Sequence, residues 1–191
     1  MAAADRRRAI LGAAVPLFIK KGAAVTTAQI AHAAGIAEGT IFRAFPDKSA
    51  LLFEAVKATM DPASVSNAIR AIGTSCSLEM RLAEAAGLLR GYLDRVSAIG
   101  ECLRSMSTNS TSRQGEVSKL IKESSASITS ALMEFFELHR AALRVSPASA
   151  VAAFRGLVFA SVHPLLPPRD RLKAEEVACI LLSGIALNRN K

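Results

Sequence analysis

The sequence of 191 residues contains no tryptophan, one tyrosine, three cysteines and three histidines. Cys76, Cys102 and Cys179 have neither the paired spacing of a zinc site nor the density of a disulfide framework, and the histidines share no ligand spacing. We therefore expect the cysteines to be small buried hydrophobic side chains in a reducing compartment, with a redox-sensing thiol as the alternative. No metal site and no cofactor are expected.

Long apolar runs are also missing from the sequence. No segment approaches the ~18 uninterrupted apolar residues that indicate a membrane span. The N-terminus imitates a secretion signal, because Arg6-Arg7-Arg8 precede a largely apolar stretch at 9–19. Apolar residues recur there at helical spacing, however, and Lys20-Lys21-Gly22 is typical of the end of a helix. We therefore expect a cytoplasmic protein without a membrane partner.

Alanine and basic charge are what the sequence has in excess. Its 36 alanines favour helices, and residues that favour strands are scarce, so the composition predicts an all-α protein. The 24 Lys and Arg residues exceed the 16 Asp and Glu residues, which gives a formal net charge of +8 and a pI of about 9.9. A basic surface suits nucleic acid or an anionic membrane, although charge does not determine the fold.

Apolar periodicity and turn residues predict about nine helices along the chain. Pro16 lies inside the first of them and is expected to kink or split it. The polar stretch 105–115 is expected to be a loop, and Met60-Asp61-Pro62 marks the boundary between two domains, residues 1–58 and 62–191. The expected helices cover roughly residues 5–21, 28–34, 37–44, 47–58, 64–72, 78–104, 116–143, 147–162 and 172–187.

Residues 26–48 carry the strongest functional signal in the sequence. Two short helices are expected there, joined by Gly35, because glycine readily adopts the left-handed backbone of a sharp turn. Such a pair forms a helix-turn-helix at about 27–46, a unit that enters the major groove of DNA. If Ile41 points into the core, the opposite face of the second helix carries small, hydroxyl, aromatic and cationic groups: Gly39, Thr40, Phe42 and Arg43.

The chemistry of this outward face suits DNA. Arg43 can reach guanine O6 and N7 or a phosphate, and Thr40 can touch a thymine methyl group or a phosphate oxygen. Gly39 allows the helix backbone to approach the groove closely. Side chains near the helix N-termini are expected to bind phosphate together with free backbone N–H groups: Thr26, Thr27 and Lys48.

A longer pattern surrounds these residues without a gap: Ile10-Leu11, Ala14, Leu17-Phe18 and Gly22, then Thr27-x-x-Ile30-Ala31-x-x-Ala34-Gly35-Ile36, then Gly39-Thr40-Ile41-Phe42-x-x-Phe45-x-x-Lys48-x-x-Leu51. In order and spacing, residues 6–57 resemble the DNA-binding domain of the TetR/AcrR family of bacterial transcription regulators. The family usually has tyrosine and often histidine where this chain has Phe42 and Ala44. Two backbone contacts to DNA are thereby lost, although Phe42 can still pack on a sugar or a thymine methyl group.

The resemblance implies that residues 62–191 hold a small-molecule pocket and a dimer interface. Several apolar side chains there, with Tyr92 and His139 as polar groups, can line a mostly apolar cavity, and ordinary helical core is the alternative for each of them. The candidate pocket residues are Met80, Leu88, Tyr92, Met106, Met133, Phe136, His139 and Phe154.

The last two expected helices carry more apolar surface than a terminal pair should bury alone. Such a surplus indicates a partner subunit, and Gly184 would allow helices of two subunits to approach closely. The candidate interface residues are Val151, Val158, Val177, Ile180, Leu181 and Gly184.

These features predict a homodimeric, DNA-binding transcriptional regulator, most simply a repressor that a small-molecule effector releases from a palindromic operator on the bacterial nucleoid. One alternative is an all-helical enzyme, but the sequence has no Ser/His/Asp order, phosphate loop or metal spacing. Another is a basic scaffold or membrane-surface protein, which would need an amphipathic Lys/Arg helix, whereas the charges here are dispersed.

Overall fold

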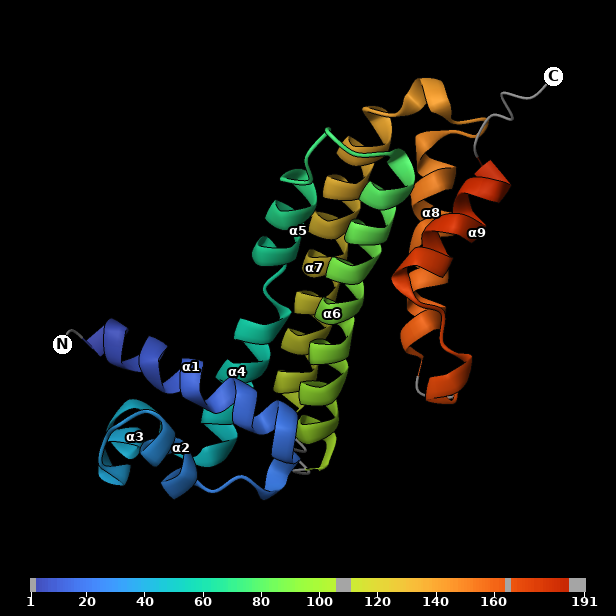
Figure 1. Cartoon of the computed structure of the whole chain (residues 1–191). Helices are drawn as coiled ribbons and strands as arrows, with labels where there is room; N and C mark the ends of the chain where they lie inside the picture. Colours follow the sequence, from blue (N-terminus) through green and yellow to red (C-terminus); the bar gives the residue numbers. More distant parts are fainter. Residues whose placement is uncertain (1–2, 106–110, 164–165, 186–191) are drawn as a thin grey trace. The chain divides into compact units, whose positions relative to one another are not determined.

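The computed structural model describes residues 3–105, 111–163 and 166–185. These residues form nine α-helices and three short 3-10 helices and no β-strand, so the expected all-α fold is confirmed (Figure 1). Within the described ranges no helix is long and apolar enough to cross a membrane. The helices are α1 (Ala3–Lys21), η1 (Gly22–Ala24), α2 (Thr27–Ala33), α3 (Glu38–Ala44), α4 (Lys48–Met60), α5 (Ala63–Arg70), α6 (Leu78–Ser105), α7 (Thr111–Glu137), η2 (Arg140–Ala142), α8 (Pro147–Val162), η3 (Pro168–Asp170) and α9 (Ala174–Ile185).

The helices belong to two compact units. The first contains Met1–Asp61 and Arg95–Lys122, and the second contains Pro62–Asp94 and Glu123–Lys191. α6 and α7 therefore contribute to both units, because each runs through one of the boundaries. A division into residues 1–58 and 62–191, as expected from the sequence, leaves out this return of the chain to the first unit.

The core of the first unit gathers the apolar faces of α1 to α4. Phe18 of α1, Ile30 of α2 and Ile41 of α3 are each at most 1% exposed, and Ile99 and Cys102 of α6 belong to the same core. Full burial of one such large apolar side chain contributes about 1.5–3 kcal/mol to folding. The two short helices α2 and α3 are thus held by the core beneath them rather than by their own stability.

α1 and α7 differ from the sequence-based expectation. Pro16 does not split α1, which runs without interruption from Ala3 to Lys21, and Ala14 and Phe18 on either side of it are buried in the same core. α7 already begins at Thr111, inside the stretch expected to be a loop. Val117 and Leu120 pack against the first core, and this packing outweighs the weak helix propensity of the preceding serine and threonine residues.

The core of the second unit forms around two phenylalanines. Phe136 of α7 and Phe154 of α8 are fully buried and meet edge to face, with ring centroids 5.9 Å apart. α8 begins where the sequence predicts, since Ser146 caps it by accepting a hydrogen bond from the Ser149 backbone N–H (3.1 Å) and Pro147 occupies the first turn. α7 ends earlier than expected, at Glu137, and the chain turns into η2.

Candidate nucleic-acid interface

The first unit contains a helix-turn-helix made of α2 and α3. α2 starts with a capping box, in which the Thr26 hydroxyl accepts from the Gln29 N–H (3.1 Å) and the Gln29 side chain accepts from the Thr26 N–H (3.3 Å). α2 ends at Ala33, and Gly35 just beyond it has a φ of 66°, which lies in the left-handed region. The Ile36 N–H then reaches back to the Ala31 carbonyl (3.0 Å), which closes a Schellman turn.

A hydrogen bond between side chains fixes the start of α3 against α2. The Thr27 hydroxyl donates to a carboxylate oxygen of Glu38, with Oγ1 and Oε1 2.5 Å apart. Glu38 lies in the first turn of α3, where a negative charge also stabilises the helix dipole. The sequence predicted Thr27 as a phosphate ligand, so this partnership was missed: the two residues are 11 positions apart, and no local pattern joins them.

The other end of α3 is held by an arginine of α1. The guanidinium of Arg7 donates to the backbone carbonyl of Ala44 and lies 4.3 Å from the centre of the buried Phe45 ring. A cation placed over an aromatic face is attracted by its negative quadrupole. Arg7 therefore fixes the C-terminal turn of α3, a role that the run of three arginines did not reveal in the sequence.

With both ends fixed, α3 presents the face that the helical wheel predicted. Ile41 is 1% exposed and points into the core, whereas Gly39, Phe42 and Arg43 are exposed and Thr40 is half-buried. A Cβ atom added to Gly39 would meet no other heavy atom within 4 Å. No side chain therefore projects from the outward face at Gly39, and the Arg43 guanidinium lies on the same face. This shape and this charge suit a major groove.

The start of α4 lies next to the helix-turn-helix. Asp47 caps α4 by accepting from the Ala50 N–H (2.7 Å), and the half-buried Lys48 donates from Nζ to the Ala23 carbonyl (2.6 Å). One of the three ammonium donors of Lys48 is thus used inside the protein, and the other two can still bind a phosphate. Thr26, exposed at the N-terminus of α2, has a hydroxyl proton left to donate.

α4 is also tied to α7 within the first unit. Lys57 forms ion pairs with Glu54 and with Glu116, each with an N–O distance of 3.3 Å. The hydrogen bond to Glu116 raises the pKa of Lys57, against the opposing effect of partial burial. Because these ion pairs are half-exposed, they stabilise the packing of α4 against α7 only modestly.

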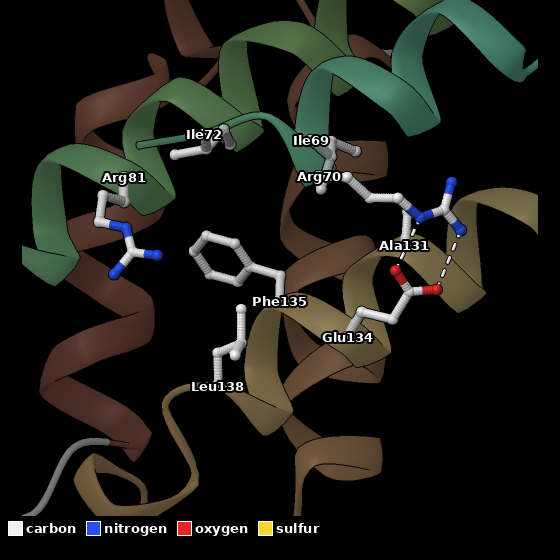
Figure 2. A pocket seen from close by; sticks show the side chains of 8 residues that line it. All are labelled: Ile69, Arg70, Ile72, Arg81, Ala131, Glu134, Phe135 and Leu138. Carbon is white, nitrogen blue, oxygen red and sulfur yellow. Dashed lines mark hydrogen bonds and ion pairs between the residues drawn. The ribbon is translucent and has the colours of Figure 1, made fainter. Parts of the chain in front are cut away.

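The candidate pocket residues of the second unit do not line one cavity. Phe136, Phe154 and Tyr92 are core residues, at most 4% exposed, and Met80 is 62% exposed. Leu88, Met133 and His139 are half-buried, and Met106 lies outside the described residues. A cavity of about 120 Å³ does exist in this unit, between α5, α6 and α7, but other residues line it: Ile69, Arg70, Ile72, Arg81, Ala131, Glu134, Phe135 and Leu138 (Figure 2).

The candidate dimer residues fall into two groups. Ile180 and Gly184 lie on the exposed face of α9, with Ile180 46% exposed. The other four are at most 4% exposed and pack inside their own chain, where α8 meets α9: Val151, Val158, Val177 and Leu181. Helical periodicity finds the apolar stripe of a helix but cannot tell which part of it faces a neighbouring helix of the same chain.

The expectation that all three cysteines are buried holds only for Cys102. Its thiol is 2% exposed, and burial raises its pKa, opposed by the charge of Lys48. Cys76 is half-buried and Cys179 is exposed on α9. Cys179 follows the buried Ala178 along the helix, so a rotation of one residue carries it out of the core.

Comparison with known proteins agrees with this geometry. Residues 10–55 match the family described as bacterial regulatory proteins, tetR family. A structure assigned to the TetR family from Mesorhizobium loti MAFF303099 is 17% identical, with a TM-score of 0.67 over 98% of this chain and 100% of that one. A TetR transcriptional regulator from Streptomyces coelicolor is 22% identical, with a TM-score of 0.60 over 94% and 98%. NalD, the secondary repressor of the MexAB-OprM multidrug efflux pump in Pseudomonas aeruginosa, is 23% identical, with a TM-score of 0.54 over 100% of both chains.

Proposed function

We propose that this chain is a DNA-binding transcriptional regulator of the TetR family. In this proposal it acts as a homodimeric repressor that a small-molecule effector releases from a palindromic operator. The observation that carries the proposal is the outward face of α3. Gly39 and Arg43 are exposed there, and both ends of the helix are anchored by hydrogen bonds from α1 and α2. A rigid helix with an exposed arginine is suited to reading base edges.

The remaining contacts to DNA would come from around the recognition helix. We assign Arg43 to base recognition, Gly39 and Thr40 to close approach, and Phe42 to packing on a sugar or thymine methyl group. Thr26, Thr27 and Lys48 would bind phosphates; of these, Thr27 would do so through its backbone N–H, because its hydroxyl is used by Glu38.

The exposed faces of α8 and α9 support a dimer. Phe159 and Ile180 are large apolar side chains that are 58% and 46% exposed. Ala152 and Gly156 of α8 and Gly184 of α9 are exposed too, and such small residues let helices of two subunits approach closely. A dimer with a two-fold axis through this face would carry two helix-turn-helix units, as a palindromic operator requires.

Repression is the mode of action that the comparisons favour. One of the structural matches, NalD, is described as a repressor. Because a repressor works by occupying its operator, a ligand that shifts the dimer to a state with lower DNA affinity would restore transcription. The cavity in the second unit offers a place for such a ligand.

The proposal is tested by DNA binding of the purified full chain to the intergenic DNA beside its own gene, measured by fluorescence anisotropy and footprinting. We expect a protected palindrome bound by one dimer. Arg43→Ala should lower the ratio of operator to random-DNA affinity roughly 5- to 150-fold, because a bidentate guanine contact contributes about 1–3 kcal/mol. Arg169→Ala, which removes an exposed arginine of the second unit, is the matched control and should leave this ratio unchanged. An unaltered ratio in Arg43→Ala would show that Arg43 does not read bases.

A further inference from the structure

Arg81 is a cation in the interior of the second unit. It lies on the inward face of α6, one turn before Ala85 and two turns before Leu89, and only 7% of the residue is exposed. The apolar stripe of α6 thus contains a charge at a position where an aliphatic side chain would be expected. Burial of a charge is costly unless a partner compensates it.

Among the described residues, no carboxylate pairs with the charge of Arg81. Its guanidinium contacts Nε2 of His139 and lies 5.5 Å from the centre of the Phe135 ring. Nδ1 of His139 lies 2.7 Å from the Phe135 carbonyl oxygen, so a neutral imidazole that donates there accepts from Arg81 at Nε2. Among the residues that the structure describes, Nε of Arg81 is buried and has no hydrogen-bond partner. A buried donor of this kind is a rarity that calls for an acceptor.

Charged and apolar side chains both line the cavity beside Arg81. Phe135 lies between Arg81 and a second arginine, Arg70 (Figure 2). Arg70 is already neutralised by Glu134 through two hydrogen bonds of 2.7 and 3.0 Å. The carboxylate of the cavity is therefore in use, and of the two arginines that line the cavity, Arg81 is the one without an ion pair to a described residue.

From this buried, unpaired guanidinium we propose that the cavity binds a small organic carboxylate. Its carboxylate would accept from Arg81, including Nε, and its apolar body would pack on Phe135, Ile69 and Ile72. The volume of about 120 Å³ is below the ~150 Å³ of an engineered apolar cavity that holds one benzene molecule, so the buried part of the ligand can be no larger than one ring or a short chain. This ligand would be the effector of the repressor, and in that respect the proposal rests on the proposed function.

The test uses benzoate and its neutral isostere benzamide as probes, titrated into the full chain by calorimetry. A charge-assisted hydrogen bond contributes about 1.5–3 kcal/mol, so benzoate should bind roughly 10- to 150-fold more tightly than benzamide. Arg81→Met should abolish this preference. The double variant Arg70→Met, Glu134→Gln is the matched control: it removes the other arginine of the cavity together with the carboxylate that pairs with it, and the preference should survive.

A spectroscopic measurement does not depend on the variants folding well. In the wild-type protein, benzoate should shift the Nε–H resonance of Arg81 downfield, because the buried donor gains an acceptor, and benzamide and chloride should not. No binding of benzoate, equal binding of benzoate and benzamide, or an unmoved Arg81 resonance would overturn the proposal. These outcomes say nothing against operator binding, which is measured separately; conversely, loss of operator binding in Arg43→Ala leaves the benzoate titration unaffected.

Discussion

Single side chains of the helix-turn-helix divide between holding the fold and facing outward. Thr27 and Arg7 hold it, since they hydrogen-bond Glu38 and the Ala44 carbonyl, while Gly39 and Arg43 face outward. Residue type could not separate these groups in the sequence, because threonine and arginine serve both tasks. Helical periodicity could place Gly39 and Arg43, because their exposure follows from their angle to the buried Ile41.

The substitution Gly39→Ala, which adds one methyl group, is expected to change DNA binding without weakening the fold. A Cβ at this position meets nothing in the protein, and alanine favours a helix over glycine by up to about 1 kcal/mol. We therefore expect Gly39→Ala to leave the free energy of unfolding equal or slightly higher, while operator affinity falls because the methyl group holds α3 away from the groove. Denaturant unfolding and anisotropy titrations measure the two effects.

Gly12→Ala is the matched control for Gly39→Ala. Gly12 is an exposed glycine of α1 that also has open space around its missing side chain. Gly12→Ala should change the free energy of unfolding to a similar extent without changing DNA affinity. If both variants bind the operator like the wild-type protein, Gly39 does not lie against DNA.

Among whole elements, those with strong local signals could be predicted from the sequence. α8 begins at Ser146 and Pro147, and the turn after α2 forms at Gly35, because cap, proline and glycine act within a few residues. The start of α7 could not be predicted, since Val117 and Leu120 are held by contacts distant in sequence. For the same reason the pairing of Arg70 with Glu134, 64 positions apart, left no local signal.

The role of Arg81 could be predicted from the sequence only in part. Its position in the apolar stripe of α6 is a signal in the sequence, because it follows the same helical period as Ala85 and Leu89. The sequence-based candidates for the pocket were mostly apolar residues, with Tyr92 and His139 as polar groups. None of those that the structure describes lines the cavity, although His139 contacts Arg81. A polar residue inside an apolar stripe is thus the better guide to this cavity.

The ion pair that links α5 to α7 makes stability depend on pH. The hydrogen bond from Arg70 lowers the pKa of Glu134 below its ordinary value. A carboxylate with a lowered pKa in the folded state stabilises the fold above its unfolded pKa, and this contribution is lost as the pH falls through the folded pKa. Glu134→Gln should therefore be less stable than the wild-type protein at pH 7, and the difference should shrink below about pH 4.

The measurement is urea unfolding of both proteins between neutral and acidic pH. The effect should be small, since both side chains are half-exposed. A difference in the free energy of unfolding that stays constant across the range would mean that Glu134 acts through packing and not through its charge.

At the scale of the whole molecule, the dimer proposal concerns the exposed face of α8 and α9. Phe159→Asp would place a charge in the middle of a face that we expect to be buried between subunits, so it should yield monomers in sedimentation velocity at concentrations where the wild-type protein is dimeric. Gly184→Leu should act similarly by holding the helices apart. The helix content should stay unchanged in both, because neither side chain packs in its own core.

The matched control is Met80→Asp, which puts the same charge on another exposed apolar residue of the second unit. It should remain dimeric. If Phe159→Asp and Gly184→Leu both stay dimeric, the subunits associate through a different surface.

The proposed communication between ligand and DNA would have a route in the chain itself. Arg81 lies on α6 and Phe135 on α7, and both helices continue into the first unit, where Ile99 and Cys102 of α6 belong to the core under the helix-turn-helix. α4 provides a further connection, because it runs from the capping Asp47 to the point where the chain leaves the first unit. Packed helices shift between discrete arrangements more readily than they bend.

This route predicts a reciprocal coupling between effector and operator. Two recognition helices must lie about 34–36 Å apart to enter successive major grooves, so a change of a few ångströms lowers DNA affinity. By linkage, an effector that weakens operator binding must bind the operator-bound dimer more weakly by the same factor, about 5- to 150-fold for a typical coupling of 1–3 kcal/mol. Titrating benzoate, or an effector found by thermal-shift screening, with and without operator measures this factor. Equal affinity in both titrations would mean that the bound molecule stabilises the second unit without acting as a switch.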